Sequence, residues 1–226
     1  MPLIVCISDT HLRHNFDVPP GDILIHAGDV TSKGTIHNNE IDTFLQWFSS
    51  LPHKHKIFIA GNHDFVFEKN PREAALYIPD DVIYLQDSEV TVEGLRIYGS
   101  PWQPLFHHWA FNLPRGTPIR QKWKLIPKGI DVLITHGPPL GILDHTLDHY
   151  DRMGSHVGCR DLRERVRYVK PRLHVFGHIH CGAGLETVDG TTFINASICD
   201  ERYVPNNRPI TTFLDPLVPE VTDDQG

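Results

Sequence analysis

Five short apolar runs along the chain predict buried β-strands. The first covers residues 3–7 and is rich in β-branched side chains. The same pattern recurs in four further runs, at residues 23–25, 57–59, 132–134 and 173–176. Continuous apolar runs of this length are typical of strands that are covered on both faces of a sheet.

Helical spacing appears between these runs. One helix is predicted by apolar residues three or four positions apart, namely Ile41, Phe44, Leu45, Phe48 and Leu51. Asn38 or Asn39 is available to cap its N-terminus. A second helix is predicted around Leu162, Val166 and Val169.

Two other segments indicate antiparallel pairing. Residues 89–98 and 185–195 alternate in the manner of hairpins, and Asp189-Gly190 in the second is a strong turn signal. We therefore expect an α/β fold in which two mixed sheets pack together with helices outside. The expected domain covers residues 1–215, and residues 216–226 are expected to form a loose, flexible tail.

Length and composition favour a single domain with a substantial hydrophobic core. The chain has 226 residues, of which 40% are hydrophobic. Its 21 basic and 28 acidic residues give a net charge of −7, which argues against broad capture of nucleic acid. Four cysteines without CxxC spacing suggest reduced, structural thiols. The sequence contains no secretory or membrane-spanning run, so we expect no membrane association and a cytoplasmic location.

Polar clusters follow each of the predicted strands. They are Asp9-Thr10-His11, Gly28-Asp29, Gly61-Asn62-His63-Asp64, His136-Gly137 and Gly177-His178-Ile179-His180. Side chains two positions apart point the same way at a strand end, so Asp9 and His11 can face one ion. Asp29 has two oxygens that can bridge two cations. Carboxylate with imidazole suits zinc, iron or manganese better than calcium, and the clusters hold enough ligands for two adjacent ions.

These clusters resemble the motifs of the calcineurin-like metallophosphoesterase family, whose blocks D-x-H, G-D, G-N-H-[DE], H and G-H-x-H occur here in order. Within it, residues 97–102, 109–112 and 173–180 look most similar to the brain-type metallophosphoesterase-domain-containing proteins and their microbial relatives. The resemblance implies a four-layer α/β/β/α sandwich. It also implies a first metal held by Asp9, His11, Asp29 and His180, and a second held by Asp29, Asn62, His136 and His178.

The same resemblance implies the catalytic roles. A hydroxide bridging the two divalent ions would attack phosphorus, while His63 would contact the phosphate with Asn62 and protonate the leaving group. Asp64 would fix the tautomer and orientation of His63. Manganese is favoured by analogy with the family, and iron, zinc, nickel and cobalt suit the same ligands.

The aromatic segment at residues 99–123 has two interpretations. It contains three of the four tryptophans, including Trp102, together with Arg115, Arg120 and Lys122. It can form a wall over the metals, with Trp102 as a binding surface for a nucleobase. It can equally be an insertion that is stabilised by its own hydrophobic cluster.

The function that these features favour is a dinuclear metal-dependent phosphodiesterase acting on small phosphodiesters or nucleotides, cyclic nucleotides among them. A phosphomonoesterase or phosphoprotein phosphatase is the first alternative, because the same metals serve both reactions. A weakly catalytic nucleotide-binding or scaffold protein is the second, and a DNA-repair nuclease is a further variant. The sequence gives no indication of oligomeric state.

Overall fold

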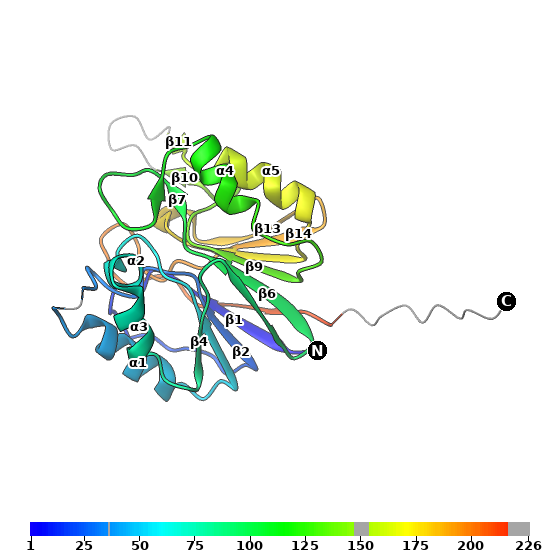
Figure 1. The fold of residues 1–226 in the computed structure, drawn as a ribbon. Helices are drawn as coiled ribbons and strands as arrows, with labels where there is room; N and C mark the ends of the chain where they lie inside the picture. Colours follow the sequence, from blue (N-terminus) through cyan, green and yellow to red (C-terminus); the bar gives the residue numbers. More distant parts are fainter. Residues whose placement is uncertain (36, 147–153, 217–226) are drawn as a thin grey trace.

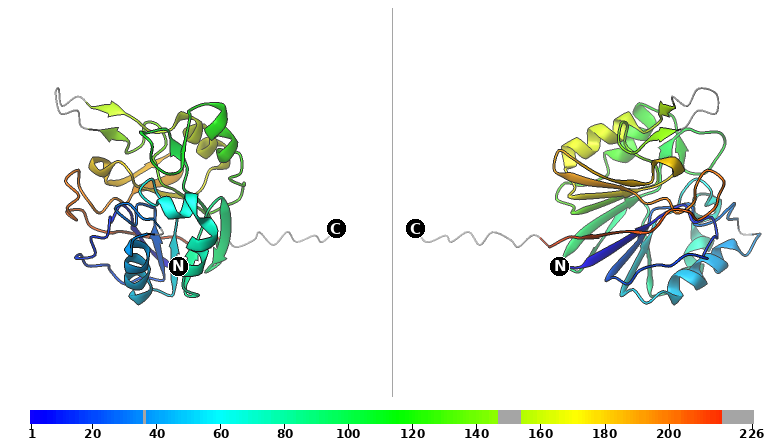
Figure 2. Two further views of the ribbon diagram at one scale, coloured as in Figure 1. Left: turned by 60° about the vertical axis from the view of Figure 1, so that its left-hand side comes forward. Right: turned by 180° about the vertical axis from the view of Figure 1, so that it is seen from behind.

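Two β-sheets pack face to face in the computed structural model, with helices on both outer sides (Figures 1 and 2). The structure describes residues 1–35, 37–146 and 154–216. This arrangement confirms the predicted α/β fold with two mixed sheets. Within the described part, no helix has the length and apolar content that crossing a bilayer requires.

The first sheet contains five strands, and four of them run parallel because each apolar run feeds a crossover on the outer face. The strands in spatial order are β15 (Ile210–Phe213), β1 (Leu3–Ile7), β2 (Ile23–His26), β3 (His55–Phe58) and β4 (Val82–Tyr84). The edge strand β15 is antiparallel to β1.

The second sheet contains six strands with a parallel centre and an antiparallel hairpin at each edge. In spatial order they are β13 (Gly184–Val188), β14 (Thr191–Asn195), β12 (Leu173–Phe176), β9 (Val132–Thr135), β6 (Leu95–Ser100) and β5 (Ser88–Val92). Both predicted hairpins are confirmed. Asp189 and Gly190 form the β13–β14 turn with φ of +53° and +81°, as a two-residue type I′ turn requires.

The helices divide between the two outer faces. On the first sheet lie α1 (Glu40–Ser50), α2 (Phe65–Lys69) and α3 (Pro71–Tyr77), and on the second lie α4 (Thr117–Trp123) and α5 (Arg160–Val169) (Figure 1). Shorter elements are β7 (Gln103–Pro104), β8 (Asn112–Leu113), β10 (His145–Thr146), β11 (Ser155–His156) and the 3₁₀ turn η1 (His180–Gly182).

Three hydrophobic clusters correspond to the three interfaces of a four-layer sandwich. Side chains such as Ile25 and Val132 meet between the sheets. Phe44 and Phe48 on α1 pack against the first sheet, and Trp123 on α4 packs with Leu162 on α5 against the second sheet. Strand residues therefore alternate between the central and the outer clusters, which is why both faces of the parallel strands are apolar.

The predicted helices are present as α1 and α5, but the capping of α1 differs from expectation. Asn39 occupies the N-cap position without a side-chain hydrogen bond to the helix. The Glu40 carboxylate accepts hydrogen bonds from the backbone of Ser32 and Lys33 instead. The expected tail at residues 216–226 lies almost wholly outside the described residues. The short elements α2, α3, α4, β4 and β15 were not predicted.

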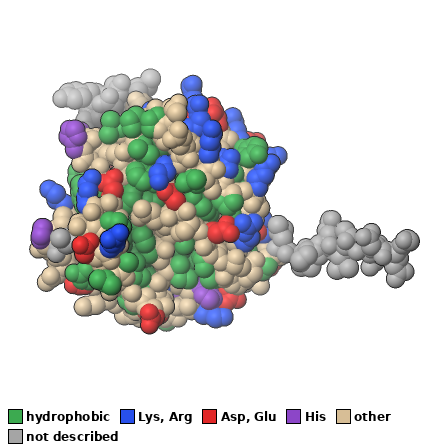
Figure 3. Space-filling model, viewed as in Figure 1, with side chains coloured by type: hydrophobic (Ala, Val, Ile, Leu, Met, Phe, Trp, Pro, Cys, Tyr) green, Lys and Arg blue, Asp and Glu red, His purple; other side chains and the backbone are tan. Residues whose placement is uncertain are grey.

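Basic side chains gather over α4 and α5 on the face shown in Figure 3, with acidic side chains among them. Several of them join the two helices. Arg120 on α4 pairs with Asp161 on α5 at 2.7 Å, and Arg165 donates to the carbonyl of Lys124 at 3.1 Å. These cations therefore contribute to packing of the outer layer.

Gly99 in β6 packs closely against residues of the first sheet's side of the core. A Cβ at this position would lie 2.5 Å from Cβ of Leu85 and 2.7 Å from Cγ2 of Ile59, both of which belong to the first sheet's side of the core. We expect Gly99→Ala to lower the free energy of unfolding by about 1–3 kcal/mol, because the sheets must separate to admit the methyl group.

Denaturant unfolding measures this effect, with Gly137→Ala as the matched control. A Cβ at Gly137 would meet the Gln103 Cβ at an ordinary 3.5 Å, so its free energy of unfolding should change by less than about 1 kcal/mol. Equal losses of unfolding free energy in the two variants would show that the close contact between the sheets at Gly99 does not cause the destabilisation.

Candidate metal centre

The polar clusters predicted from the sequence meet at one end of the molecule, where the parallel strands of both sheets finish. Three of them follow strands of the first sheet and two follow strands of the second. A bridge between Ser8 and Ser197 joins the sheets at this point, and the Ile198 N–H donates to the Ser8 carbonyl at 2.9 Å. The site therefore lies at the junction of the two sheets.

Left-handed backbone conformations turn the ligand side chains inward. Asp and His are among the non-glycine residues that tolerate positive φ best, although each still costs roughly 1 kcal/mol. Positive φ occurs at four of the seven predicted ligands, Asp9 (50°), His11 (44°), Asp29 (54°) and His178 (68°). The loops hold one another in place, since the backbone N–H of Asp9 donates to the Gly28 carbonyl and that of His11 to the Asp29 carbonyl.

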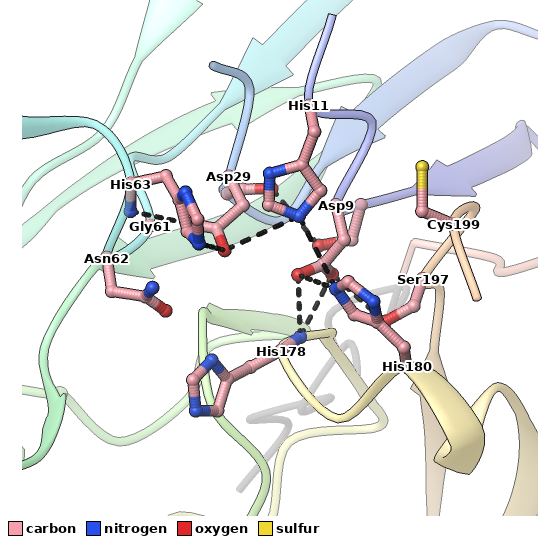
Figure 4. A network of polar contacts seen from close by, with 12 residues as sticks. Asp9, His11, Asp29, Gly61, Asn62, His63, His178, His180, Ser197 and Cys199 are labelled. Carbon is pink, nitrogen blue, oxygen red and sulfur yellow. Dashed lines mark hydrogen bonds and ion pairs between the residues drawn. The ribbon is translucent and has the colours of Figure 1, made fainter. Parts of the chain in front are cut away.

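The first ligand group consists of Asp9, His11 and His180, whose ligand atoms lie within 4.8 Å of one another. Nε2 of His180 lies 3.5 Å from Oδ1 of Asp9 and 3.4 Å from Nε2 of His11. The Asp9 carboxylate is held by the hydroxyl of Ser197 and by the backbone N–H of His178, each at 2.9 Å. These charge-assisted bonds fix where the carboxylate points (Figure 4).

The second ligand group consists of Asp29, His136 and His178. Oδ1 of Asp29 lies 3.4 Å from Nε2 of His136, and the amide oxygen of Asn62 lies 2.9 Å from the same nitrogen. The other Asp29 oxygen lies 3.8 Å from Nε2 of His11. Asp29 therefore stands between the two groups, and the structure brings together all seven predicted ligands.

Backbone carbonyls orient three of the imidazoles. Nδ1 of His11 faces the Thr31 carbonyl at 3.1 Å, Nδ1 of His136 faces Ala27 at 3.0 Å, and Nδ1 of His180 faces Asp200 at 2.8 Å. A carbonyl only accepts, so each Nδ1 carries the hydrogen and each neutral ring turns an Nε2 lone pair into the cluster.

This donor set fits a pair of divalent metal ions. Nε2 of His11 and Nε2 of His180 face each other at 3.4 Å, so a cation between them would accept both lone pairs once the rings are neutral. Two buried carboxylates and an amide oxygen complete a set of oxygen and nitrogen ligands without thiolate, which suits manganese, iron, zinc, nickel or cobalt. The ligands and their carbonyl partners match what metal-binding histidines require.

The two carboxylates of the site are ionised, and a bound cation would replace the proton on His136. Burial opposes ionisation of Asp9 and Asp29, but neighbouring histidines outweigh it and hold both carboxyl pKa values well below the usual range. Burial would lower the pKa of His136, yet the charge of Asp29 raises it to about 9. Burial and the nearby His136 lower the pKa of His178 to about 3. Two anions are therefore fixed in a buried site.

His63 lies beside the predicted ligands, and its ring forms a third group with His11 and Asp29 whose ligand atoms lie within 4.8 Å of one another. Its Nδ1 donates to the Ser32 carbonyl at 2.5 Å, and its Nε2 lies 3.9 Å from Oδ2 of Asp29. The Trp109 ring packs on it with centroids 4.2 Å apart. Nε2 is thus directed toward the ligand cluster.

The expectation that Asp64 fixes the tautomer of His63 is wrong. The Ser32 carbonyl does so, and the Asp64 carboxylate accepts instead from the backbone N–H groups of Val30, Thr31 and Gly61 and from the Thr31 hydroxyl. Asp64 therefore ties the Asp29 loop to the Gly61 loop. Burial and the charge of Asp29 raise the pKa of Asp64 to about 6.

The close contact between the Asp29 loop and the Gly61 loop requires glycine at position 61. A Cβ on Gly61 would lie 2.3 Å from both the backbone nitrogen and Oδ1 of Asp29, so no side chain fits between the loops. The close approach lets the His63 N–H donate to Oδ1 of Asp29 at 2.8 Å. One loop thereby positions the shared carboxylate and His63 together.

A pocket of about 720 Å³ opens above the metal ligands. Asp29, Asn62, His63, His178 and His180 form its floor. Its apolar lining includes Leu105, Phe106 and Trp109, and residues 200–203 and Arg115 also line it.

The structure places Trp102, the predicted binding surface for a nucleobase, outside the pocket lining. Its indole N–H donates to Asp87 at 2.9 Å, its ring packs on Phe111, and it is not among the pocket residues. Trp109 lies beside His63 and lines the pocket instead. The aromatic segment divides between the two interpretations, because Trp123 is in the core while Phe106 and Trp109 reach the pocket.

Hydrogen bonds pin the loop that carries these pocket residues. The Ala110 N–H donates to the Asn62 carbonyl at 3.0 Å, and the backbones of Gln103 and Leu105 pair with Phe111 and Leu113. The cations of the segment are engaged elsewhere. Arg115 donates to the carbonyls of Gly158 and Val157, and Lys122 pairs with Asp87 at 2.8 Å.

Several contributors were not identified from the sequence. Ser197 and Asp200 follow β14, a strand whose own end carries no recognisable ligand motif. Ser32 orients His63 through its backbone oxygen, and its hydroxyl donates to the His11 carbonyl at 3.3 Å, but it belongs to none of the predicted clusters. The position of Ser197 just after the apolar pair Phe193-Ile194 is the one cue that could have placed it at the same edge.

Comparison with known proteins identifies the family. A family model described as calcineurin-like phosphoesterase matches residues 2–182. The human and mouse proteins named metallophosphoesterase domain-containing protein 1 are each 48% identical over 234 aligned residues, covering 93% of this chain and 70% of theirs. A Caenorhabditis elegans protein, UPF0046 protein C25E10.12, is 42% identical and covers 96% of this chain and 82% of its own.

Solved structures show the same fold at low identity. The phosphopantetheinyl hydrolase of Mycobacterium tuberculosis superposes with a TM-score of 0.57 at 17% identity, covering 94% of this chain and 96% of its own. The family model covers all seven predicted ligands. The chain belongs to the calcineurin-like phosphoesterase family.

Proposed function

We propose that this phosphoesterase is a dinuclear metal-dependent phosphodiesterase for small phosphodiesters, including cyclic nucleotides. The observation that carries the proposal is the pair of ligand groups that share Asp29 beside His63, at the floor of a largely apolar pocket. When bound, the two cations would lower the pKa of a water molecule and neutralise charge on the phosphate. Manganese is the proposed ion.

The residues of the chain supply orientation and a proton. Because Nδ1 of His63 is tied to the Ser32 carbonyl, a second proton can reside only on Nε2, which faces the ligand cluster. In that form His63 donates to the phosphate or to the leaving oxygen. Trp109 packs on the ring and excludes water from one side of it.

A diester is favoured over a monoester by the charges near the pocket. A monoester carries one more negative charge, which usually calls for arginines directed at the phosphate. Arg115 and Arg202 line the pocket, but Arg115 spends both terminal nitrogens on backbone carbonyls and Arg202 is exposed on the turn at residues 200–206. The apolar side formed by Leu105, Phe106 and Trp109 suits the ester group of a small substrate instead.

Metal content tests the shared role of Asp29. Elemental analysis of manganese-loaded wild-type protein should give about two ions per chain, and His11→Ala or His136→Ala about one, because each removes a ligand of one group only. Asp29→Ala should retain almost none, since both groups lose a carboxylate. Two ions retained by Asp29→Ala would contradict the shared site.

His63 is tested by the dependence of its effect on the leaving group. His63→Ala should reduce kcat for a 2′,3′-cyclic nucleotide by about 10²- to 10⁴-fold, because a ribose oxygen must be protonated as it leaves. The reduction should be smaller for methyl p-nitrophenyl phosphate, whose leaving group needs no proton. Metal content should stay at the wild-type level.

The matched control is His108→Ala, an exposed histidine on the same loop as Trp109. It should leave kcat unchanged for both substrates. An equal loss for the two leaving groups in His63→Ala would rule out proton donation by this residue.

The choice between diester and monoester is tested with one leaving group. At saturating manganese, kcat/KM for methyl p-nitrophenyl phosphate should exceed that for p-nitrophenyl phosphate by about tenfold or more, and Asp29→Ala should hydrolyse neither. The panel then extends to 2′,3′- and 3′,5′-cyclic nucleotides and mononucleotides. Faster turnover of the monoesters would favour the phosphomonoesterase alternative.

A further inference from the structure

Residues 200–206 form a tight turn that brings Tyr203 to the edge of the pocket. The Asp200 carboxylate builds this turn, since Oδ1 accepts from the backbone N–H of Arg202 and Val204 and Oδ2 accepts from the Asn206 side chain at 2.7 Å. The Asp200 N–H donates in turn to the Val204 carbonyl at 2.8 Å. The turn is therefore held by its own bonds.

Tyr203 has a backbone conformation that is strained for a residue with a large side chain. Its φ is +58°, in the left-handed region where a bulky residue is strained and glycine is not. The Tyr203 side chain is 44% exposed and is not part of any of the three hydrophobic clusters. Burial in the core therefore does not explain why a tyrosine stands here.

The Tyr203 ring contacts the metal site instead. Its centroid lies 4.8 Å from that of His11, 5.4 Å from His180 and 6.2 Å from His63, each at a steep interplanar angle. The turn is also joined to a ligand, because the Asp200 carbonyl accepts from Nδ1 of His180 at 2.8 Å. The ring thus covers the first ligand group and lines the pocket.

The two sides of the pocket differ as a result. Phe106 lies over the second ligand group, with its ring centroid 6.0 Å from that of His178, on a loop whose Leu105 and Phe106 are more than half exposed. Over the first ligand group, the Tyr203 ring fills the space next to His11 and His180. One ester group of a bound phosphodiester would therefore meet the exposed apolar surface of Leu105 and Phe106. The other would meet the Tyr203 ring, which forms a wall.

We propose that Tyr203 is a specificity-determining residue that admits only phosphodiesters whose second ester group is small, such as a methyl ester or a ring closed back on the first group. This inference rests on the proposed phosphodiesterase function. It assigns the strain at Tyr203 to substrate selection at the site. It also orients the substrate, with the larger ester group against Leu105, Phe106 and Trp109.

Three variants test the proposal. Tyr203→Gly removes the wall and relaxes the backbone, Tyr203→Phe keeps the ring, and Tyr77→Ala removes a similarly exposed tyrosine on α3, 42% exposed. The measured quantity is the ratio of kcat/KM for bis(p-nitrophenyl) phosphate to that for methyl p-nitrophenyl phosphate. Tyr203→Gly should raise this ratio by about tenfold, and the other two should leave it unchanged.

The melting temperature of metal-free protein separates specificity from a structural role. Tyr203→Gly should melt at or above the wild-type temperature, because the left-handed residue is then unstrained. A lower melting temperature together with an unchanged substrate ratio would overturn the proposal and make Tyr203 a packing residue.

Binding distinguishes failure of this inference from failure of the proposed function. Calorimetry on manganese-loaded protein should give dimethyl phosphate similar affinities for wild type and Tyr203→Gly, and should give diphenyl phosphate a higher affinity for the variant. If neither protein hydrolyses any diester, the proposed function fails. The difference in affinity for diphenyl phosphate would still test whether the Tyr203 ring excludes a large ester group. Equal affinities of diphenyl phosphate for both proteins would overturn the inference.

Discussion

Two ionised carboxylates buried at the junction of the sheets are the constraint on which this site depends. Asp9 and Asp29 are almost inaccessible to water, and isolated buried charges of one sign are strongly unfavourable. The surrounding backbone compensates in part, through the His178 N–H on Asp9 and the His63 N–H on Asp29. The neighbouring histidines keep both carboxyl groups ionised, and bound cations would complete the compensation.

The geometry around these carboxylates follows from how the sheets join. The Ser8–Ser197 bridge brings β1 and β14 together, so that the hydroxyl of Ser197 reaches Asp9 from the second sheet. Asp64 draws the Asp29 loop against Gly61, where no side chain fits. The separation of the two ligand groups is therefore set by strand packing and by one buried carboxylate outside both ligand groups. Strained φ values at Asp9 and Asp29 are maintained by these bonds.

The strands and ligands were predictable from the sequence because both depend on position along parallel strands. Apolar runs identified β1, β2, β3, β9 and β12, and the shared edge of such strands is enough to place His136 and His178 near Asp29. The role of Asp64 was not predictable, because its partners are backbone N–H groups of a neighbouring loop. Trp102 and Trp109 occupy an irregular segment without periodicity, so their sequence positions did not indicate which ring faces the pocket. Tyr203 follows an edge hairpin and belongs to no motif.

The loop between β7 and β8 is fastened at both ends, by the pairing of Gln103 and Leu105 with Phe111 and Leu113 and by the bond from Ala110 to Asn62. Its middle carries the Phe106 side chain out over the pocket, while the Phe106 carbonyl accepts from the Asn112 side chain at 2.7 Å. Substitutions in this middle part can change the shape offered to an ester group while the fastened ends keep Asn62 in place. The chain thus has a segment in which new substrate preferences can arise by mutation without the metal ligands having to be rebuilt.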